Sequence, residues 1–318
     1  MKTYSGYRDD SSLLESSSGG AASALAESFV QNGGVVFGTA YASDFKSAEM
    51  IKADNMDTLS KLRGSKYVET RKNFTEVLGS LSECKTVLVF GLGCDIGALR
   101  ALLKKKDIDD SHLYTVDILC HGPSSTDVLR GYIEDLERKY HAKIKAFHVR
   151  YKKEGWTPPY VRAEFENGKI YEEVFEFTDY GYAFNKYALP RCTKCHFKGE
   201  QHTGDLCLGD YWGVEKSDTG YNPNGVSLII VQTEKGQQLL SMLSSGFKLQ
   251  EIDFNNAISH NPAYYQCREQ GTDYNLFSEA IKQKSLHETL LLLPEYRKWK
   301  RSVRVIKAKR KMLKMIGK

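Results

Sequence analysis

Two short, uninterrupted apolar runs constrain the fold of this chain most. Residues 86–90 and residues 113–119 are each followed by a glycine-containing turn and then by a stretch of helix-favouring residues. A continuous apolar run of this length is typical of a strand that is buried on both faces of a sheet. The repeated order of strand, turn and helix therefore predicts a parallel α/β core.

The pattern changes in the middle of the chain. Residues 145–149, 160–165 and 169–175 alternate as short strands, and Glu166-Asn167-Gly168 separates the last two as a hairpin turn. Residues 192–209 are rich in loop-forming residues. We therefore predict an α/β core with an α+β insertion: a mixed sheet with flanking helices and a cysteine-bearing loop region.

The remaining predicted elements are helices and strands that flank this core. Helices are expected over residues 21–31, 57–62, 74–81, about 96–103, about 126–140 and 236–244, and further strands over residues 35–41 and 226–232. The 318 residues are enough for two lobes, or for one large domain with additions.

The charge of the chain is unevenly distributed. Residues 297–318 carry 11 of the 45 Lys and Arg and none of the 40 Asp and Glu, which leaves 34 basic and 40 acidic residues in the body. A mildly acidic body argues against a general nucleic-acid surface, and we expect no nucleic-acid partner. Trp299, Val303, Ile306, Leu313 and Ile316 recur at roughly helical spacing in the basic tail. Such a helix can lie on an anionic membrane, dock an acidic partner, or remain a solvated extension.

The start of the chain, Met-Lys-Thr-Tyr-Ser-Gly, has no apolar signal core, and the aliphatic runs are too short to span a bilayer. We expect a cytoplasmic protein, with a peripheral contact at the inner face of the membrane as an option for the tail. Structural disulfides are rare in a reducing compartment. The seven cysteines are then core residues, ligands of a metal or cluster, or redox groups.

Four of the cysteines are candidates for one shared site. Cys192 and Cys195 form a C-x-x-C pair, which is compatible with zinc, an iron–sulfur cluster or a redox disulfide. Cys94 lies just beyond the first apolar run and Cys120 ends the second. Ligands bind beyond the carboxyl ends of the strands in an open parallel sheet, so the four thiolates could meet there. The alternative is that Cys94 and Cys120 are buried structural thiols.

The other three cysteines lack such a context. We interpret Cys84, Cys207 and Cys267 as structural, with Cys207 near enough to Cys195 in the sequence to serve as a reserve ligand.

Two segments are candidates for phosphate or dinucleotide binding. Ser-Ser-Ser-Gly-Gly (16–20) precedes a predicted helix, whose N-terminus would present free N–H groups to an anion; a plain serine N-cap is the alternative. Leu-Arg-Gly-Ser-Lys-Tyr-Val (62–68) combines two cations, a glycine turn and an aromatic ring, and could equally be a solvated loop. Residues 91–93 lack a full dinucleotide fingerprint.

In combination, these blocks resemble the coenzyme F420 hydrogenase/dehydrogenase beta-subunit family. The resemblance rests on residues 16–20 and 62–68, on Cys-His-Gly-Pro (120–123) and on Gly-Asp-Tyr-Trp-Gly (209–213), and it extends over roughly residues 4–265. It implies FAD and one 4Fe–4S cluster in the same subunit. The flavin would exchange a hydride with a two-electron partner, and the cluster would pass single electrons onward.

The resemblance also assigns residues. Cys94, Cys120, Cys192 and Cys195 become the expected cluster ligands, and the expected flavin-site residues are Ser18, Gly19, Gly20, Arg63, Lys66 and His121. No catalytic residue is assigned. The implied organisation is an N-terminal flavin-site region (1–82), a cluster-binding region (83–290) and the basic tail (291–318).

Two departures from the family pattern have consequences. The family usually has Gly-Thr-Pro-Cys-Gln where this chain has Gly91-Leu92-Gly93-Cys94-Asp95, so the geometry around Cys94 is expected to differ. Many relatives carry additional N-terminal cysteines, whereas no cysteine precedes Cys84 here. One cluster at most is expected, with an external redox partner: a deazaflavin, ferredoxin or a nicotinamide donor.

Shortened relatives of this kind resemble those associated with polysaccharide-pyruvyl transferase and surface-glycan synthesis, which suggests glycan-synthesis enzymes as partners. Two alternatives to an oxidoreductase remain. One is a non-enzymatic scaffold of a glycan-synthesis assembly with a structural iron–sulfur or zinc site. The other is a zinc-bound transferase, because four thiolates also suit zinc.

Overall fold

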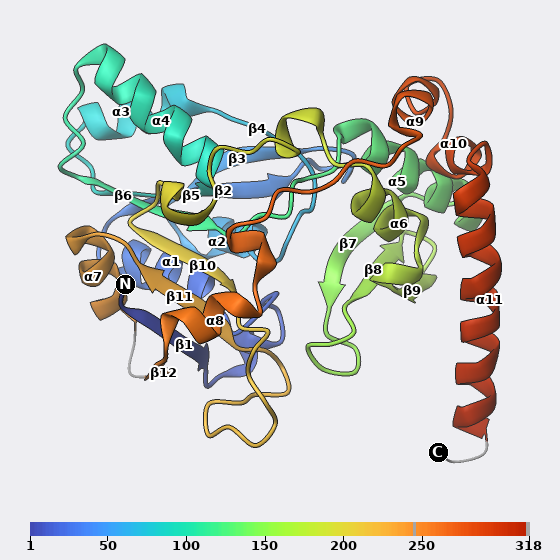
Figure 1. The fold of residues 1–318 in the computed structure, drawn as a ribbon. Coiled ribbons are helices and arrows are strands. Elements are labelled where there is room, and N and C mark those ends of the chain that lie inside the picture. Colours follow the sequence, from blue (N-terminus) through green and yellow to red (C-terminus); the bar gives the residue numbers. More distant parts are fainter. Residues whose placement is uncertain (244–245, 316–318) are drawn as a thin grey trace.

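A computed structural model describes residues 1–243 and 246–315 and contains two sheets (Figure 1). The strands are β1 (Thr3–Arg8), β2 (Val35–Tyr41), β3 (Ala48–Ala53), β4 (Thr70–Arg71), β5 (Val87–Leu92), β6 (Leu113–Ile118), β7 (Ile144–Tyr151), β8 (Tyr160–Phe165), β9 (Ile170–Val174), β10 (Leu206–Asp210), β11 (Ser227–Val231) and β12 (Phe247–Glu251). The helices are α1 (Ala21–Gln31), α2 (Met56–Leu62), α3 (Phe74–Ser82), α4 (Gly93–Lys106), α5 (Thr126–Tyr140), α6 (Asp179–Lys186), α7 (Glu234–Ser241), α8 (Phe254–Ser259), α9 (Tyr274–Ala280), α10 (Leu286–Leu291) and α11 (Pro294–Met315).

The larger sheet is mixed, with the strand order β12-β1-β11-β10-β6-β5-β2-β3-β4. Strands β2, β5, β6 and β10 run parallel at its centre, and β1, β3, β11 and β12 pair antiparallel toward its edges. The predicted parallel core is therefore confirmed. Because β5, β6 and β10 share one direction, the residues that follow Leu92, Ile118 and Asp210 lie at the same edge of the sheet.

Helices cover both faces of this sheet. Leu88 of β5 packs in one cluster with residues of α1 and α7, whereas its neighbours Val87 and Val89 pack in a second cluster with residues of α3 and α4. Successive strand residues point to opposite faces, so a strand that is covered on both sides needs an uninterrupted apolar run. This is the physical reason for the run at residues 86–90.

A second lobe contains the antiparallel sheet β7-β8-β9 together with α5, α6, α9, α10 and the first part of α11 (Figure 1). Its core is rich in aromatic rings, and Phe165, Tyr180 and Tyr296 are fully buried. Strands β8 and β9 form the predicted hairpin, with Gly168 at φ 79° in its turn. The α+β insertion is therefore confirmed.

Several elements differ from the prediction. Strands β1, β3, β4, β10 and β12 were not predicted, nor were helices α6, α8, α9 and α10. Helix α4 begins at Gly93 rather than near Ile96. Helix α7 ends at Ser241, and Ser244, the predicted end of that helix, lies outside the described residues, as do Ile316 and Lys318 of the tail. Strand β1 belongs to the predicted region 1–82. It lies between β11 and β12, which both belong to the predicted region 83–290.

Candidate functional site

The four cysteines of the predicted cluster site line one pocket of about 100 Å³. Cys94 lies in the first turn of α4, immediately after β5, and Cys120 lies two residues after β6. Cys192 and Cys195 come from the loop that follows α6. We call this space the four-cysteine pocket. Its position beyond the ends of two parallel strands agrees with the place expected for ligands of an open α/β sheet.

Gly122 fits between two of these cysteines. Its N–H lies 3.1 Å from the Cys120 sulfur and donates to it. Its φ is +90°, and a Cβ atom at this position would lie 3.1 Å from Cβ and 3.5 Å from Sγ of Cys192. Both the backbone conformation and the close approach require glycine.

The C-x-x-C loop is held over α4 by two further contacts. The Lys198 ammonium donates to the carbonyl oxygens of Cys120 and Ala263, each at 2.6 Å. The Phe197 ring lies over two glycines of α4: a Cβ at Gly93 would be 3.1 Å from Phe197 Cβ, and a Cβ at Gly97 would be 2.5 Å from the ring. The altered block 91–95 thus provides the space that Phe197 occupies.

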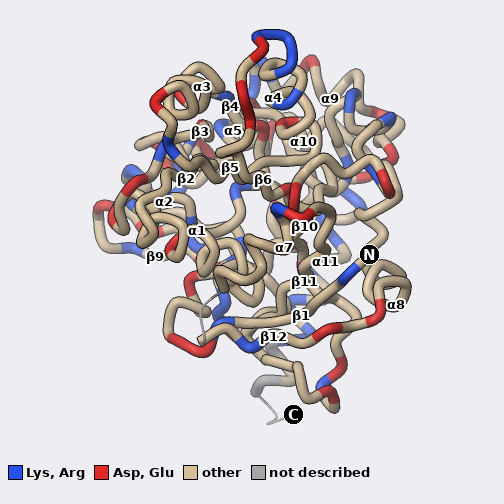
Figure 2. The backbone as a smooth tube through the Cα atoms, turned by 90° about the vertical axis from the view of Figure 1, so that its left-hand side faces the viewer, with Lys and Arg blue, Asp and Glu red and all other residues tan. Residues whose placement is uncertain are grey.

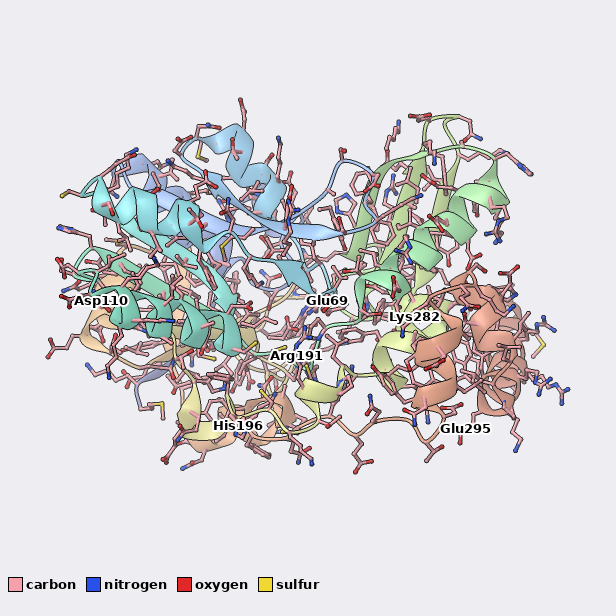
Figure 3. All side chains as sticks on the ribbon, turned by 90° about the horizontal axis from the view of Figure 1, so that it is seen from above. Glu69, Asp110, Arg191, His196, Lys282 and Glu295 are labelled. Carbon is pink, nitrogen blue, oxygen red and sulfur yellow. The ribbon has the colours of Figure 1, made fainter. Side chains whose placement is uncertain are left out.

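The junction of the two lobes closes one side of the pocket. Arg191 donates to the carboxylate of Glu69 at 3.0 Å, and both residues line the pocket near the middle of the molecule seen from above (Figure 3). This partly exposed ion pair links the start of the C-x-x-C loop to the residue that precedes β4.

Burial makes three of these thiols weaker acids than a free cysteine. It raises the pKa of both Cys94 and Cys120 to about 11 and also raises the pKa of Cys192, and the charges of the neighbouring cysteines add to each increase. Four thiolates would therefore repel one another unless a cation lay among them. Binding of a cationic group would release their protons.

No three of the four sulfur atoms, all of which belong to the described residues, lie within 4.8 Å of one another. Sulfur ligands of a tetrahedral zinc ion lie about 3.8 Å apart, since each Zn–S bond is about 2.3 Å. In residues 1–243 and 246–315, one set of three or more possible metal ligands has donor atoms within 4.8 Å of one another, and it contains Cys207 and none of these four cysteines. The four-cysteine pocket thus has room for a group larger than a single ion.

The remaining three cysteines do not line this pocket. Cys84 is exposed at the end of α3, and Cys267 is exposed with its sulfur 3.6 Å from the carbonyl oxygen of Cys195. Cys207 is fully buried on β10 and does not line the four-cysteine pocket.

A larger cavity of about 370 Å³ adjoins this pocket. Of the six predicted flavin-site residues, Ser18, Gly20, Arg63, Lys66 and His121 line it. Gly19 does not line the cavity and packs against β1 instead, because a Cβ atom at this position would lie 2.2 Å from the carbonyl oxygen of Gly6.

The structure brings the two predicted flavin segments together. The Ser17 hydroxyl accepts a bond from the N–H of Ser65 at 2.8 Å and lies 2.9 Å from the Ser65 hydroxyl. Gly20, at φ 86°, is the N-cap of α1, so the alternative of a serine N-cap is wrong. Ser18 instead donates to the carbonyl oxygen of Val226 at 2.9 Å.

Lys66 and Arg63 have different roles in the cavity wall. The Lys66 ammonium lies 2.7–3.1 Å from four backbone carbonyl oxygens of residues 61–64, which share its three N–H donors. It therefore holds the turn after α2. Burial lowers the pKa of Lys66 to about 7. Arg63 pairs with Glu15 and Glu27, while its buried Nε has no hydrogen-bond partner.

Arg150 is a cavity residue that the sequence analysis missed. It comes from β7 of the second lobe, its side chain is 6% exposed, and its Nη1 lies 2.5 Å from the carboxylate of Asp210. Its Nε and Nη2 have no hydrogen-bond partner, and its guanidinium lies 5.6 Å from the centre of the Trp212 ring. Asp210 and Trp212 belong to the block 209–213, which was the available signal that this region faces a ligand site.

Helix α11 differs from the rest of the surface in its charge. Acidic and basic residues are interspersed over the face that carries β1 and β12 (Figure 2), whereas α11 contains ten Lys or Arg and one Glu. Lys307 pairs with Glu173, and Arg310 lies over the Phe177 ring. The apolar residues Val305, Ile306, Met312 and Leu313 of this helix are exposed. None of the helices in the described residues has both the length and the apolar character needed to cross a membrane.

Comparisons with known proteins agree with this architecture. The family model for the C-terminal part of the beta subunit of coenzyme F420 hydrogenase/dehydrogenase matches residues 84–255, more than half of the chain. A chain of the F420-reducing [NiFe] hydrogenase complex from Methanosarcina barkeri, solved as a xenon derivative, has a similar fold: the TM-score is 0.57 at 18% identity, over 91% of each chain. No curated protein matches the sequence. The chain therefore belongs to the coenzyme F420 hydrogenase/dehydrogenase beta-subunit family.

Proposed function

We propose that this protein transfers electrons between FAD in the large cavity and a 4Fe–4S cluster in the four-cysteine pocket. One observation carries the proposal: the two spaces adjoin and share Cys120, His121, Gly122 and Pro123 as lining residues. The family and the similar hydrogenase fold support a redox role. When bound, the flavin would supply hydride exchange with a two-electron partner and the cluster would supply single-electron transfer.

The residues of the smaller pocket suit a cluster. Cys94, Cys120, Cys192 and Cys195 supply four sulfur ligands, and their spacing exceeds that of ligands around one zinc ion. The cationic iron would compensate the negative charge of the four thiolates, among which burial disfavours the charged forms of Cys94 and Cys120. Gly122 keeps Cys120 and Cys192 on the same side of the pocket.

The residues of the large cavity suit a flavin with its phosphates. Arg63 and Arg150 each leave buried N–H groups without a partner, and a buried donor without an acceptor costs about 1–3 kcal/mol. Anionic phosphate oxygens or the ring carbonyls of a flavin would accept from them. Leu62, Phe90 and Leu208 give the cavity an apolar wall for a ring system. Ser17 and Ser65 join the two loops that would surround the ligand.

Purification under anaerobic conditions tests the proposal. We expect a brown-yellow protein with about four iron, four sulfide and one FAD per chain. The double substitution Cys192→Ser and Cys195→Ser should remove iron and sulfide, whereas Cys84→Ser, at an exposed cysteine outside both pockets, should leave them unchanged. Zinc in place of iron, or a colourless protein after cluster reconstitution, would contradict the proposal and favour the structural zinc or scaffold alternative.

We further propose that α11 attaches the protein to an anionic membrane surface. Lys307 and Arg310 face the body of the protein, and Val305, Ile306, Met312 and Leu313 are left exposed on the same helix. A second copy of this helix would bring together two strongly cationic segments, whereas anionic headgroups complement them. Apolar side chains between cations are the arrangement of an interfacial helix. The external electron partner and the setting in surface-glycan synthesis stay predictions from the resemblance.

A further inference from the structure

A second group of ligand-type side chains lies beside the four-cysteine pocket. Asp117 on β6 and Cys207 on β10 are register partners in adjacent parallel strands, and His202 lies in the loop that leads into β10. Asp117 and Cys207 are fully buried, and the His202 side chain is 3% exposed. We propose that these three residues bind one divalent transition-metal ion, with Zn²⁺ as the best match, separately from the four-cysteine pocket.

The distances among the three donor atoms are close to those of a metal site. His202 Nδ1 lies 3.0 Å from Asp117 Oδ2 and 3.7 Å from Cys207 Sγ, and all three donor atoms lie within 4.8 Å of one another. Bonds of about 2.0–2.3 Å in a tetrahedral zinc site place its ligand atoms roughly 3.3–3.6 Å apart. The two distances from His202 Nδ1 are therefore within a few tenths of an ångström of this range, and the limit of 4.8 Å holds for the distance between Asp117 and Cys207.

An unsatisfied polar atom in this group also favours a ligand. Asp117 Oδ2 accepts from the N–H groups of Thr203 and Gly204 at 3.1 and 3.3 Å, but Asp117 Oδ1 has no hydrogen-bond partner. Buried polar atoms are nearly always paired, so a fully buried carboxylate with a free oxygen calls for a cation or a bound water.

The charge balance selects a divalent cation. Asp117 brings one negative charge to the buried site, and Cys207 brings a second once its thiol has lost its proton to a bound metal ion. A divalent ion would displace that proton and neutralise the two anionic ligands, Asp117 and Cys207. The site would then be uncharged as a whole, which removes most of the cost of burying its ionised groups.

The surroundings fix the histidine and provide access. The Tyr264 ring stacks on the His202 ring with 4.9 Å between their centres. His202 also lines the four-cysteine pocket, which gives a metal ion a route inward. Sulfur, nitrogen and carboxylate oxygen are the ligand types that zinc takes most often, and a water or Asp117 Oδ1 can complete the fourth position.

Metal titration separates this site from the four-cysteine pocket. The protein carries Cys192→Ser and Cys195→Ser, so that the four-cysteine pocket no longer offers four thiolates, and is titrated anaerobically with Co²⁺ and then with Zn²⁺. We expect one equivalent of Co²⁺ with a thiolate-to-cobalt charge-transfer band, displaced by one equivalent of Zn²⁺. Adding Cys207→Ser should abolish the band, and adding His202→Gln should abolish stoichiometric binding. Cys84 lies outside the proposed site of Asp117, His202 and Cys207. Adding Cys84→Ser should therefore change neither the charge-transfer band nor the stoichiometry of binding.

A thermal-unfolding measurement distinguishes loss of the metal site from misfolding of a variant. Zn²⁺ should raise the Tm of the double variant and leave the Tm unchanged once His202→Gln is added. Absence of a thiolate-to-cobalt band in the double variant, or its persistence after Cys207→Ser, would overturn the metal site and indicate a hydrogen-bonded group or bound water. Neither result depends on whether the wild-type protein holds FAD or a 4Fe–4S cluster.

Discussion

Arg150 of β7 and Asp210 of β10 form a buried ion pair that joins the two lobes at the wall of the large cavity. Replacing Arg150 by Leu would leave the Asp210 carboxylate buried without its cation, and breaking a buried pair in this way costs about 3–5 kcal/mol. We expect this loss in the free energy of unfolding measured with guanidinium chloride.

The variant Arg150→Lys separates stability from flavin binding. Lysine keeps a charge near Asp210 but lacks the fork of N–H donors, of which Nε and Nη2 are free in Arg150. Its loss of stability should be smaller, whereas its retention of FAD through gel filtration should fall. Equal FAD content in Arg150→Lys and the wild type would exclude a contact between these N–H groups and the flavin.

Gly122→Ala should damage the four-cysteine pocket. Its φ of +90° makes a side chain costly by about 1–2 kcal/mol, and the new Cβ would press on Cys192. We expect lower stability together with a lower iron content after anaerobic purification. Gly168→Ala is the matched control, because Gly168 also has positive φ (+79°) but a Cβ there meets no atom within 4 Å. That control should lose stability and keep its iron; an unchanged iron content in Gly122→Ala would contradict the prediction.

Acid should detach the C-terminal helices from α6. Burial opposes ionisation of Asp179, but hydrogen bonds from His287, Lys300 and Tyr296 outweigh it and lower the pKa of this carboxyl to about 2. A pKa below the unfolded value of about 3.9 stabilises the fold above about pH 4, and this stabilisation disappears as the pH falls toward 2. Urea unfolding between pH 5 and 2 should show the decrease, and Asp179→Asn should make the curve flatter. An equally steep curve in that variant would contradict the prediction.

His287 should make the same junction sensitive near neutral pH. Its hydrogen bond to Asp179 raises its pKa above 6.5. The stabilisation is therefore complete below the unfolded pKa of about 6.5 and is lost as the pH rises through the folded value. A second urea-unfolding series, from about pH 6 to about pH 9, should show this decrease in the wild type, and His287→Gln should remove it. A wild-type free energy of unfolding that rises between these two pH values would contradict the prediction.

The exposed face of α11 should carry the membrane contact. The double substitution Ile306→Asp and Leu313→Asp should reduce co-sedimentation with anionic vesicles at low salt by removing apolar contacts and adding negative charge. The matched control changes two exposed leucines elsewhere, Leu249→Asp and Leu276→Asp. Equal binding by both double variants, or no wild-type binding to anionic vesicles, would exclude attachment through this face.

The sequence was informative where burial imposed a simple pattern. The doubly covered strand β5 requires an uninterrupted apolar run, and α1 and α5 have the bounds expected for them. Strand β12 escaped prediction because four of its five residues are exposed at the sheet edge, so that no apolar alternation marks it.

The candidate site was predictable in part for the same reason. Strand ends could be located, so Cys94 and Cys120 could be assigned to one edge of the sheet. Arg150 could not, because its place in the cavity depends on how the second lobe packs against Asp210. The role of Lys66 likewise depends on a turn whose four carbonyls converge on its ammonium, a geometry that no local pattern encodes.

The position of β1 has a consequence for biosynthesis. Residues 3–8 pair on one side with β11 and on the other with β12, which are synthesised more than 200 residues later. During translation this segment therefore leaves the ribosome long before either partner strand exists. Pairings of such large sequence separation form slowly, and unpaired strands promote aggregation. We therefore expect residues 3–8 to stay unpaired until residue 251 has left the ribosome.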